Sequence, residues 1–90
     1  MEAEFDARLG RLLQRRRRQL GLTQQQLGKA VGVRFQQIHR YETGANKVTA
    51  ERLWALAKAL DVPVTYFFDE LEASGPGVGT TPIRRSARGA

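Results

Sequence analysis

The chain has 90 residues, with 15 Lys and Arg against 9 Asp and Glu, and a formal net charge of +6. This length indicates one small domain, which buries only roughly 60 % of the surface of its unfolded chain and leaves little room for an enzyme pocket. The lack of cysteine and the single histidine exclude a disulfide framework and a Cys- or His-rich metal site, and we expect no cofactor. The basic charge favours a polyanionic partner, nucleic acid before an anionic membrane surface.

The distribution of charge and apolar residues predicts how the chain is organised. No apolar run approaches the ~20 residues that a membrane span needs, and no signal peptide is recognisable, so we expect a cytoplasmic protein that does not enter membranes. The basic excess lies in residues 1–22 and 72–90, whereas residues 23–71 are nearly neutral. The last segment is rich in Gly, Pro, Ser and Thr, which predicts a disordered, flexible basic tail (72–90) after a folded domain (5–71). Three possibilities remain open for this tail. It could have no function, it could fold on a partner, or it could contact DNA through its arginines (Arg84, Arg85 and Arg88).

Apolar residues recur at helical spacing throughout the domain, which predicts an all-α fold of five helices. The first helix is expected over residues 6–20, with Leu9, Leu13 and Leu20 on one apolar stripe, and Gly21 ends it. The arginine run at residues 15–18 is open to two interpretations, a solvated helix face or an added attraction for phosphates.

The second helix has a complete start signal. Thr23 is the expected N-cap and Gln26, three residues later, closes a capping box. Gly32 supplies the left-handed residue that ends this helix. Its expected buried residues are Leu27, Ala30 and Val31.

Three further helices follow after short connections. The third opens at Arg34 and turns Ile38 and Tyr41 toward the core. Thr49 is the expected N-cap of the fourth, and Pro63 precedes the fifth. The apolar positions of the fifth helix are Val64, Phe67, Phe68 and Leu71.

A very short, glycine-containing connection between the second and third helices forces a sharp angle, which is the geometry of a helix-turn-helix motif. The segments TQQQLGKAVGVRFQQIHRYETG and TAERLWALAKALDVPVTYFF closely resemble the Cro and lambda-type repressors of the XRE family over roughly residues 8–68. The matching positions are Thr23, Gln24, Leu27, Ala30, Gly32, Val33, Ile38, Glu42, Gly44 and the junction at 60–63. The resemblance implies a five-helix lambda-repressor-like domain that binds double-stranded DNA in a sequence-specific manner and regulates transcription, more specifically as a repressor.

The outward residues of the third helix are candidates for reading bases in the major groove: Arg34, Phe35, Gln36, Gln37, His39 and Arg40. Gln pairs with adenine, Arg with guanine, and an aromatic ring packs on the thymine methyl group. In the family, the base-contacting positions fall on Arg34, Phe35, Gln36 and Arg40. Two assignments stay open. Phe35 could instead be buried against its own domain, and His39 could contact a phosphate or be a surface residue with no role in binding. Arg34 departs from the Ser or Thr that is usual at this N-cap, because a guanidinium cannot accept from the first-turn amides.

Three other residues are candidates for contacts with DNA phosphates. Gln24 lies at the start of the second helix, where free N–H groups and the helix dipole attract anions. Asn46 and Lys47 lie in the loop before the fourth helix, where family members touch the DNA backbone. Such contacts set the register of the protein on DNA without reading sequence.

Two charges are predicted to point inward. Arg17 lies on the apolar stripe of the first helix, and Glu42 follows Ile38 by four residues on the third. Because an unpaired buried charge is strongly disfavoured, we expect a structural bidentate ion pair between Arg17 and Glu42, which the resemblance also implies. No second acid, nucleophile or base accompanies Glu42, so we expect no enzyme activity.

The resemblance also implies a homodimer on a palindromic operator, with two third helices about one DNA turn, roughly 34 Å, apart. Trp54 could serve a subunit contact or pack partly against the fifth helix. A different class of function remains as the alternative: an antitoxin or another interaction protein that is sequestered by a protein partner and binds DNA only secondarily.

Overall fold

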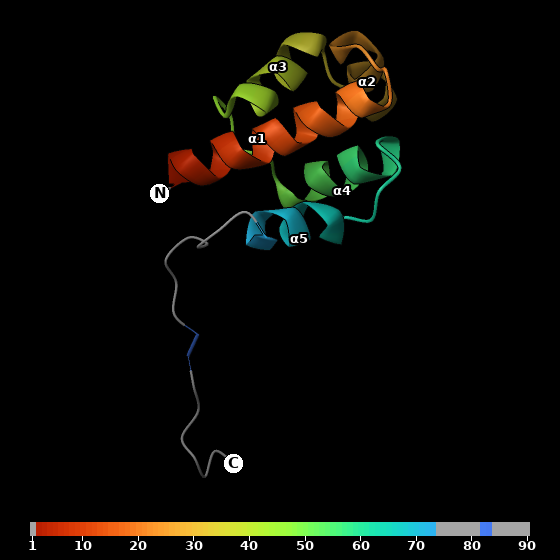
Figure 1. Cartoon of the computed structure of the whole chain (residues 1–90). Helices are drawn as coiled ribbons and strands as arrows, with labels where there is room; N and C mark the ends of the chain where they lie inside the picture. Colours follow the sequence, from red (N-terminus) through yellow and green to blue (C-terminus); the bar gives the residue numbers. More distant parts are fainter. Residues whose placement is uncertain (1, 74–81, 84–90) are drawn as a thin grey trace.

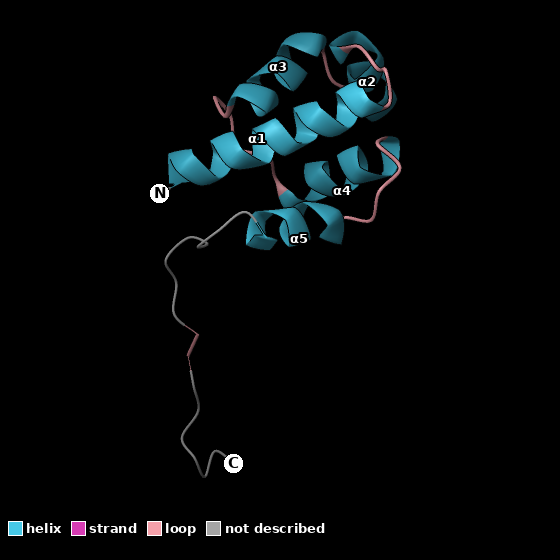
Figure 2. Ribbon diagram, in the orientation of Figure 1, coloured by secondary structure: helices cyan, strands magenta, loops and turns pink. Residues whose placement is uncertain are grey.

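The computed structural model describes residues 2–73 and 82–83, and this part of the chain contains helices and no strands (Figures 1 and 2). The helices are α1 (Glu2–Gln19), α2 (Gln24–Val31), α3 (Phe35–Thr43), α4 (Ala50–Ala59) and α5 (Thr65–Ala73). The predicted five-helix, all-α fold is therefore confirmed. Most of the predicted tail, including its three arginines, lies outside the described residues. None of the helices in the described ranges is long and apolar enough to cross a bilayer.

Local sequence signals determine where α2 and α4 begin. Thr23 Oγ1 accepts a hydrogen bond from the main-chain N–H of Gln26 at 3.0 Å, and Gln26 Oε1 accepts one from Thr23 N–H at 2.9 Å. These two bonds form the predicted capping box. Thr49 Oγ1 likewise accepts from the N–H of Arg52 at 3.1 Å. The left-handed Gly32, with φ of +80°, ends α2.

Helix α1 crosses the middle of the molecule, with α2 and α3 on one side of it and α4 and α5 on the other (Figure 1). The core fills the space between these helices with leucines and a few larger side chains. Its buried apolar residues are Leu9, Leu13, Leu27, Ile38, Tyr41, Leu53, Leu56, Ala57, Leu60, Phe67 and Leu71. Gly10 allows α1 to approach α3 closely, because a Cβ there would lie less than 3 Å from the carbonyl oxygens at the end of α3.

The arginine run on α1 holds the helices together, an interpretation that the sequence did not suggest. Arg15 Nη2 pairs with Glu70 Oε1 on α5 at 2.8 Å, and Arg16 Nε donates to the carbonyl oxygen of Leu60 at 2.9 Å. The latter bond satisfies a carbonyl group at the C-terminal end of α4, where intrahelical donors are missing. Arg15, Arg16 and Arg17 thus have partners within the protein, whereas Arg18 is exposed.

Several expectations from the sequence are wrong in detail. Helix α1 begins four residues earlier than predicted, and residues 72 and 73 continue α5 instead of starting the tail. Ala30 is exposed, because its small side chain fits the solvent side of α2 as well as the core. Leu20 is 39 % exposed, since it follows the last residue of α1 and no longer continues the apolar stripe. Phe68 is 47 % exposed, because the adjacent Phe67 fills the core.

Candidate nucleic-acid interface

A turn of three residues, 32–34, joins α2 to α3. Its backbone packs directly on α2, because a Cβ at Gly28 would lie 2.6 Å from the carbonyl oxygen of Val33. Glycine at this position therefore permits the close approach that turns α3 sharply away from α2. This is the connection expected of a helix-turn-helix motif.

Helix α3 has two chemically different faces. Ile38, Tyr41 and Glu42 are buried on its inner side. The side chains on the outer side surround a shallow hollow of about 380 Å³ that is lined by Val33, Arg34, Gln36, Gln37 and Arg40. Four of the six predicted base-reading residues thus come together around one surface depression.

The first turn of α3 lacks a side-chain cap. Arg34 is the N-cap residue in an extended conformation, and its side chain makes no capping hydrogen bond. This is the expected consequence of placing a donor-only guanidinium where an acceptor is needed. The neighbouring Phe35 is 42 % exposed and is absent from the packed core, so its ring is accessible at the same end of the helix.

The predicted ion pair connects α1 to α3 beneath this face. Arg17 Nε donates to Glu42 Oε2 at 2.6 Å, and Arg17 Nη2 donates to Glu42 Oε1 at 3.0 Å. Arg17 is 7 % exposed and Glu42 is 4 % exposed. A third bond, from Arg17 Nη1 to the carbonyl oxygen of Leu22 at 2.7 Å, holds the start of the helix-turn-helix motif. The pair is bidentate and buried, and it braces α3 and α2 against α1.

Gln24 extends this network to the surface. Its Nε2 donates to Glu42 Oε1 at 3.0 Å and lies 3.4 Å from Nδ1 of His39. His39 itself is exposed on α3. The network therefore brings two predicted phosphate-contacting residues, which are 15 positions apart, to one edge of the outer face of α3.

The loop between α3 and α4 contains the other two predicted phosphate-contacting residues. Asn46 is half-buried, and its main-chain N–H donates to the carbonyl oxygen of Arg40 at 3.2 Å. Lys47 is exposed, and its Nζ lies 3.3 Å from Oδ2 of Asp6 on α1. Asp6 is not recognisable from the sequence as the partner of Lys47, because the pair joins residues 41 positions apart and no apolar stripe points Lys47 toward α1.

The titratable groups of the described residues offer little catalytic chemistry. Hydrogen bonds to the Tyr66 hydroxyl and to the Glu70 carboxylate raise the pKa of the exposed Arg15 guanidinium, which stays charged at any physiological pH. No group of three or more His, Asp or Glu side chains in the described ranges could hold a metal ion. The chemistry that the site can supply is hydrogen bonding and positive charge on the outer face of α3.

Comparison with known protein families identifies the motif. The model of the helix-turn-helix family HTH_3 matches residues 13–67, which is more than half of the chain. The chain belongs to this XRE-type family of helix-turn-helix transcriptional regulators. The matched range contains α2, α3 and α4, and it includes every residue predicted to contact DNA. Membership in a family of regulators agrees with the expectation that the protein is not an enzyme.

Two proteins of similar sequence are transcriptional regulators of Rhodospirillum rubrum and Sinorhizobium medicae. An uncharacterized transcriptional regulator in the ATPase CF(0) region of Rhodospirillum rubrum is 48 % identical over 71 residues, covering 79 % of this chain and 66 % of the relative. An uncharacterized HTH-type transcriptional regulator of Sinorhizobium medicae is 42 % identical over 75 residues, covering 83 % of this chain and 54 % of the relative. The chain thus matches about half to two thirds of the length of these curated relatives.

Solved structures show the same helix-turn-helix fold. The clp gene regulator ClgR of Corynebacterium glutamicum superposes with a TM-score of 0.74 at 27 % identity, covering 78 % of this chain and 74 % of ClgR. PlcR of Bacillus thuringiensis, solved with the peptide PapR7 and DNA, gives a TM-score of 0.63 at 29 % identity, covering 69 % of this chain and 22 % of PlcR.

Proposed function

We propose that the protein is a sequence-specific regulator that inserts α3 into the major groove of double-stranded DNA and represses transcription from its operator. The observation that carries this proposal is the outer face of α3, where guanidinium and amide groups surround one hollow on a helix whose other face is buried. Arg and Gln are the side chains that form bidentate bonds with guanine and adenine. We assign base reading to Arg34, Gln36 and Arg40, with Gln37 beside them and Phe35 packing on a thymine methyl group.

Phosphate contacts from the start of α2 and from the loop after α3 would hold the helix in the groove. At the start of α2, the Gln24 amide donates to Glu42 and lies 3.4 Å from Nδ1 of His39, so a phosphate at this edge would meet both Gln24 and His39. In the loop after α3, Asn46 is half-buried, and Lys47 is exposed and pairs with Asp6. These contacts fix orientation and add salt-dependent affinity without reading sequence.

A homodimer on a palindromic operator is part of the proposal. Apolar side chains remain uncovered on α4 and α5: Trp54 is 55 % exposed, with the Lys58 ammonium group 3.9 Å from its ring centroid, and Phe68 is 47 % exposed. A twofold contact through these two helices would present two copies of α3 to half-sites about 34 Å apart. Sedimentation of the protein at micromolar concentration tests the dimer. A protein that is monomeric both alone in solution and when bound to operator DNA would contradict it.

Selection of bound sites from random duplexes tests the DNA-binding function. The proposal predicts enrichment of a short motif with two inverted half-sites whose centres lie one helical turn apart. Equal recovery of all sequences would contradict sequence-specific binding. Placing the selected site across a promoter in an in vitro transcription reaction then tests repression, and unchanged transcript yield would contradict the repressor role.

A further inference from the structure

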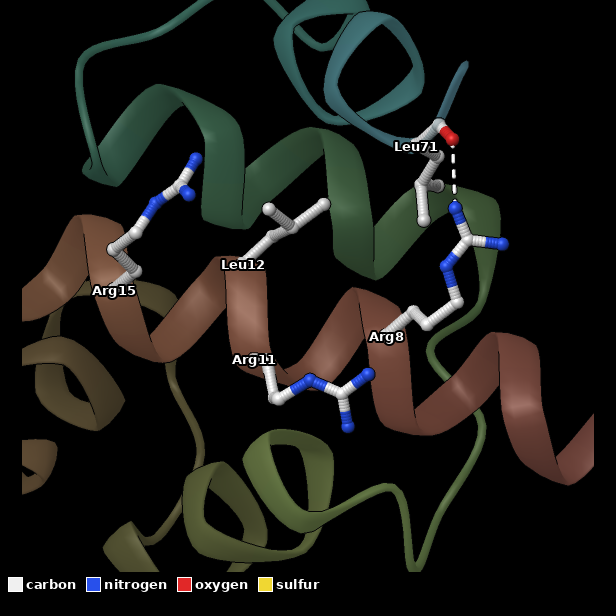
Figure 3. A pocket seen from close by; sticks show the side chains of 5 residues that line it. All are labelled: Arg8, Arg11, Leu12, Arg15 and Leu71. Carbon is white, nitrogen blue, oxygen red and sulfur yellow. Dashed lines mark hydrogen bonds between the residues drawn. The ribbon is translucent and has the colours of Figure 1, made fainter. Parts of the chain in front are cut away.

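A second basic surface lies between α1 and α5, apart from the proposed DNA-binding face. It is a groove of about 400 Å³ lined by Arg8, Arg11, Leu12, Arg15 and Leu71 (Figure 3). The three arginines lie on α1, and the first and last are seven positions, or roughly 10 Å, apart along the helix. Leu12 and Leu71 provide the apolar part of the lining, and no acidic residue contributes to it.

Leu12, Arg8 and Arg15 line the groove on the side of α1 that faces away from α3, and Arg11 lies on the flank of the helix, about 100° from Gly10 (Figure 3). Gly10 abuts the end of α3, and Leu12 projects about 200° from Gly10 around the helix axis. Figure 1 agrees, since α1 separates α3 from α5. A ligand in this groove would therefore leave the outer face of α3 uncovered.

The three guanidinium groups are not equivalent. Arg8 Nη2 donates to the carbonyl oxygen of Leu71 at 2.7 Å, as the dashed line in Figure 3 shows, and Arg15 pairs with Glu70. These bonds clamp α5 to α1. Arg11 is exposed, and the described residues offer its guanidinium no hydrogen-bond partner. Its five N–H donors can bind a carboxylate in the bidentate geometry that arginine favours.

The surroundings of the arginines select the type of anion. The Glu70 carboxylate, which pairs with Arg15, places one negative charge beside the lining residues, and this disfavours a polyphosphate or another highly charged ligand. The two leucines favour an apolar body instead. The chain's own segment 74–90 is a poor occupant, because it carries three arginines and no acidic side chain.

We propose that this groove binds a small monocarboxylic acid with an apolar body. The carboxylate is held by Arg11, with Arg8 and Arg15 adding positive charge, and the hydrocarbon part covers Leu12 and Leu71. Because such a ligand contacts both α1 and α5, it stabilises the docking of α5 and raises the melting temperature of the protein.

Titration of the ¹⁵N-labelled full chain with sodium octanoate, followed by amide chemical shifts, tests the site. We expect saturable shifts confined to residues 8–15 and 70–72, and an octanoate-dependent rise in melting temperature. Acetate, which lacks the apolar body, should bind at least about tenfold more weakly. No saturable shift in these segments, or inorganic phosphate binding as tightly as octanoate, would overturn the proposal.

Two matched variants separate a specific site from general positive charge. Arg11→Gln removes the proposed carboxylate ligand from an exposed position and should weaken octanoate binding by at least about tenfold. Arg18→Gln makes the same charge change at another exposed position of α1 outside the groove and should leave octanoate affinity unchanged. Equal behaviour of the two variants would refute the assignment of Arg11. Neither titration requires DNA, so failure here leaves the proposed DNA-binding function untouched.

Discussion

Replacing Arg17 by alanine tests whether the buried ion pair holds the DNA-binding motif together. In the parent protein, Glu42 receives two bonds from Arg17 and one from the Gln24 amide. The substitution leaves a carboxylate that is 4 % exposed with the amide as its remaining partner and also removes the donor to the Leu22 carbonyl. Breaking a buried pair from one side costs about 3–5 kcal/mol, because the other charge stays buried without compensation.

The expected loss corresponds to a large change in thermal stability. For a domain of 60–100 residues, 1 kcal/mol shifts the melting temperature by about 4–8 °C, so a loss of about 3 kcal/mol lowers it by about 12–24 °C. Thermal unfolding followed by circular dichroism at 222 nm measures this shift. The neighbouring exposed residue provides the control, since Arg18→Ala should melt within a few degrees of the parent.

A double variant distinguishes the ion pair from simple packing at the same place. Arg17→Met combined with Glu42→Leu removes both charges and fills the space with apolar atoms, so it should recover about half or more of the stability lost in Arg17→Ala. An Arg17→Ala variant that melts like the parent would refute the reasoning. A double variant that is less stable than Arg17→Ala would show that the charge left on Glu42 is not the main cost.

Three further predictions follow from the proposed interface and the helix packing. Gln36→Ala and Arg40→Ala should each remove about 1–3 kcal/mol of discrimination at particular base pairs in competition binding assays, whereas equal losses on every sequence would contradict base reading. Lys47→Ala should weaken binding to all duplexes alike and reduce the slope of log affinity against log salt by about one, and an unchanged slope would exclude a phosphate contact. Gly10→Ala should lower the free energy of unfolding by about 1–3 kcal/mol, because the new Cβ overlaps carbonyl oxygens of α3, and parent-like melting would contradict this close packing.

The sequence predicts best where local chemistry decides the structure. Thr23 with Gln26, and Thr49, mark the starts of α2 and α4 correctly because a cap is a short-range hydrogen-bond pattern. The Arg17–Glu42 pair is predictable for a different reason: both charges lie on apolar stripes, and few partners could neutralise them in a small core. The start of α1 has no such cap residue, and its prediction is four residues late.

Contacts between a side chain and a distant carbonyl oxygen could not be predicted. Arg8 and Arg16 bond main-chain oxygens that are 63 and 44 positions away. Every residue offers such an acceptor, so residue type carries no signal for the pairing. The Lys47–Asp6 pair could not be predicted for a similar reason, because charged residues are usually exposed to solvent and their type does not indicate a partner. The angle of the turn between α2 and α3 likewise determines which outward residues of α3 lie around one hollow. The spacing of residues along the sequence does not give this angle.

Parallel selection of random duplexes by the parent, Gln36→Ala and Lys47→Ala most directly tests the claim that α3 reads DNA sequence. The parent should enrich one motif with two inverted half-sites. Gln36→Ala should lose the base preference at one position of each half-site, while Lys47→Ala should enrich the parent motif with lower overall affinity. Absence of a motif for the parent, or an unaltered motif for Gln36→Ala, would contradict this account.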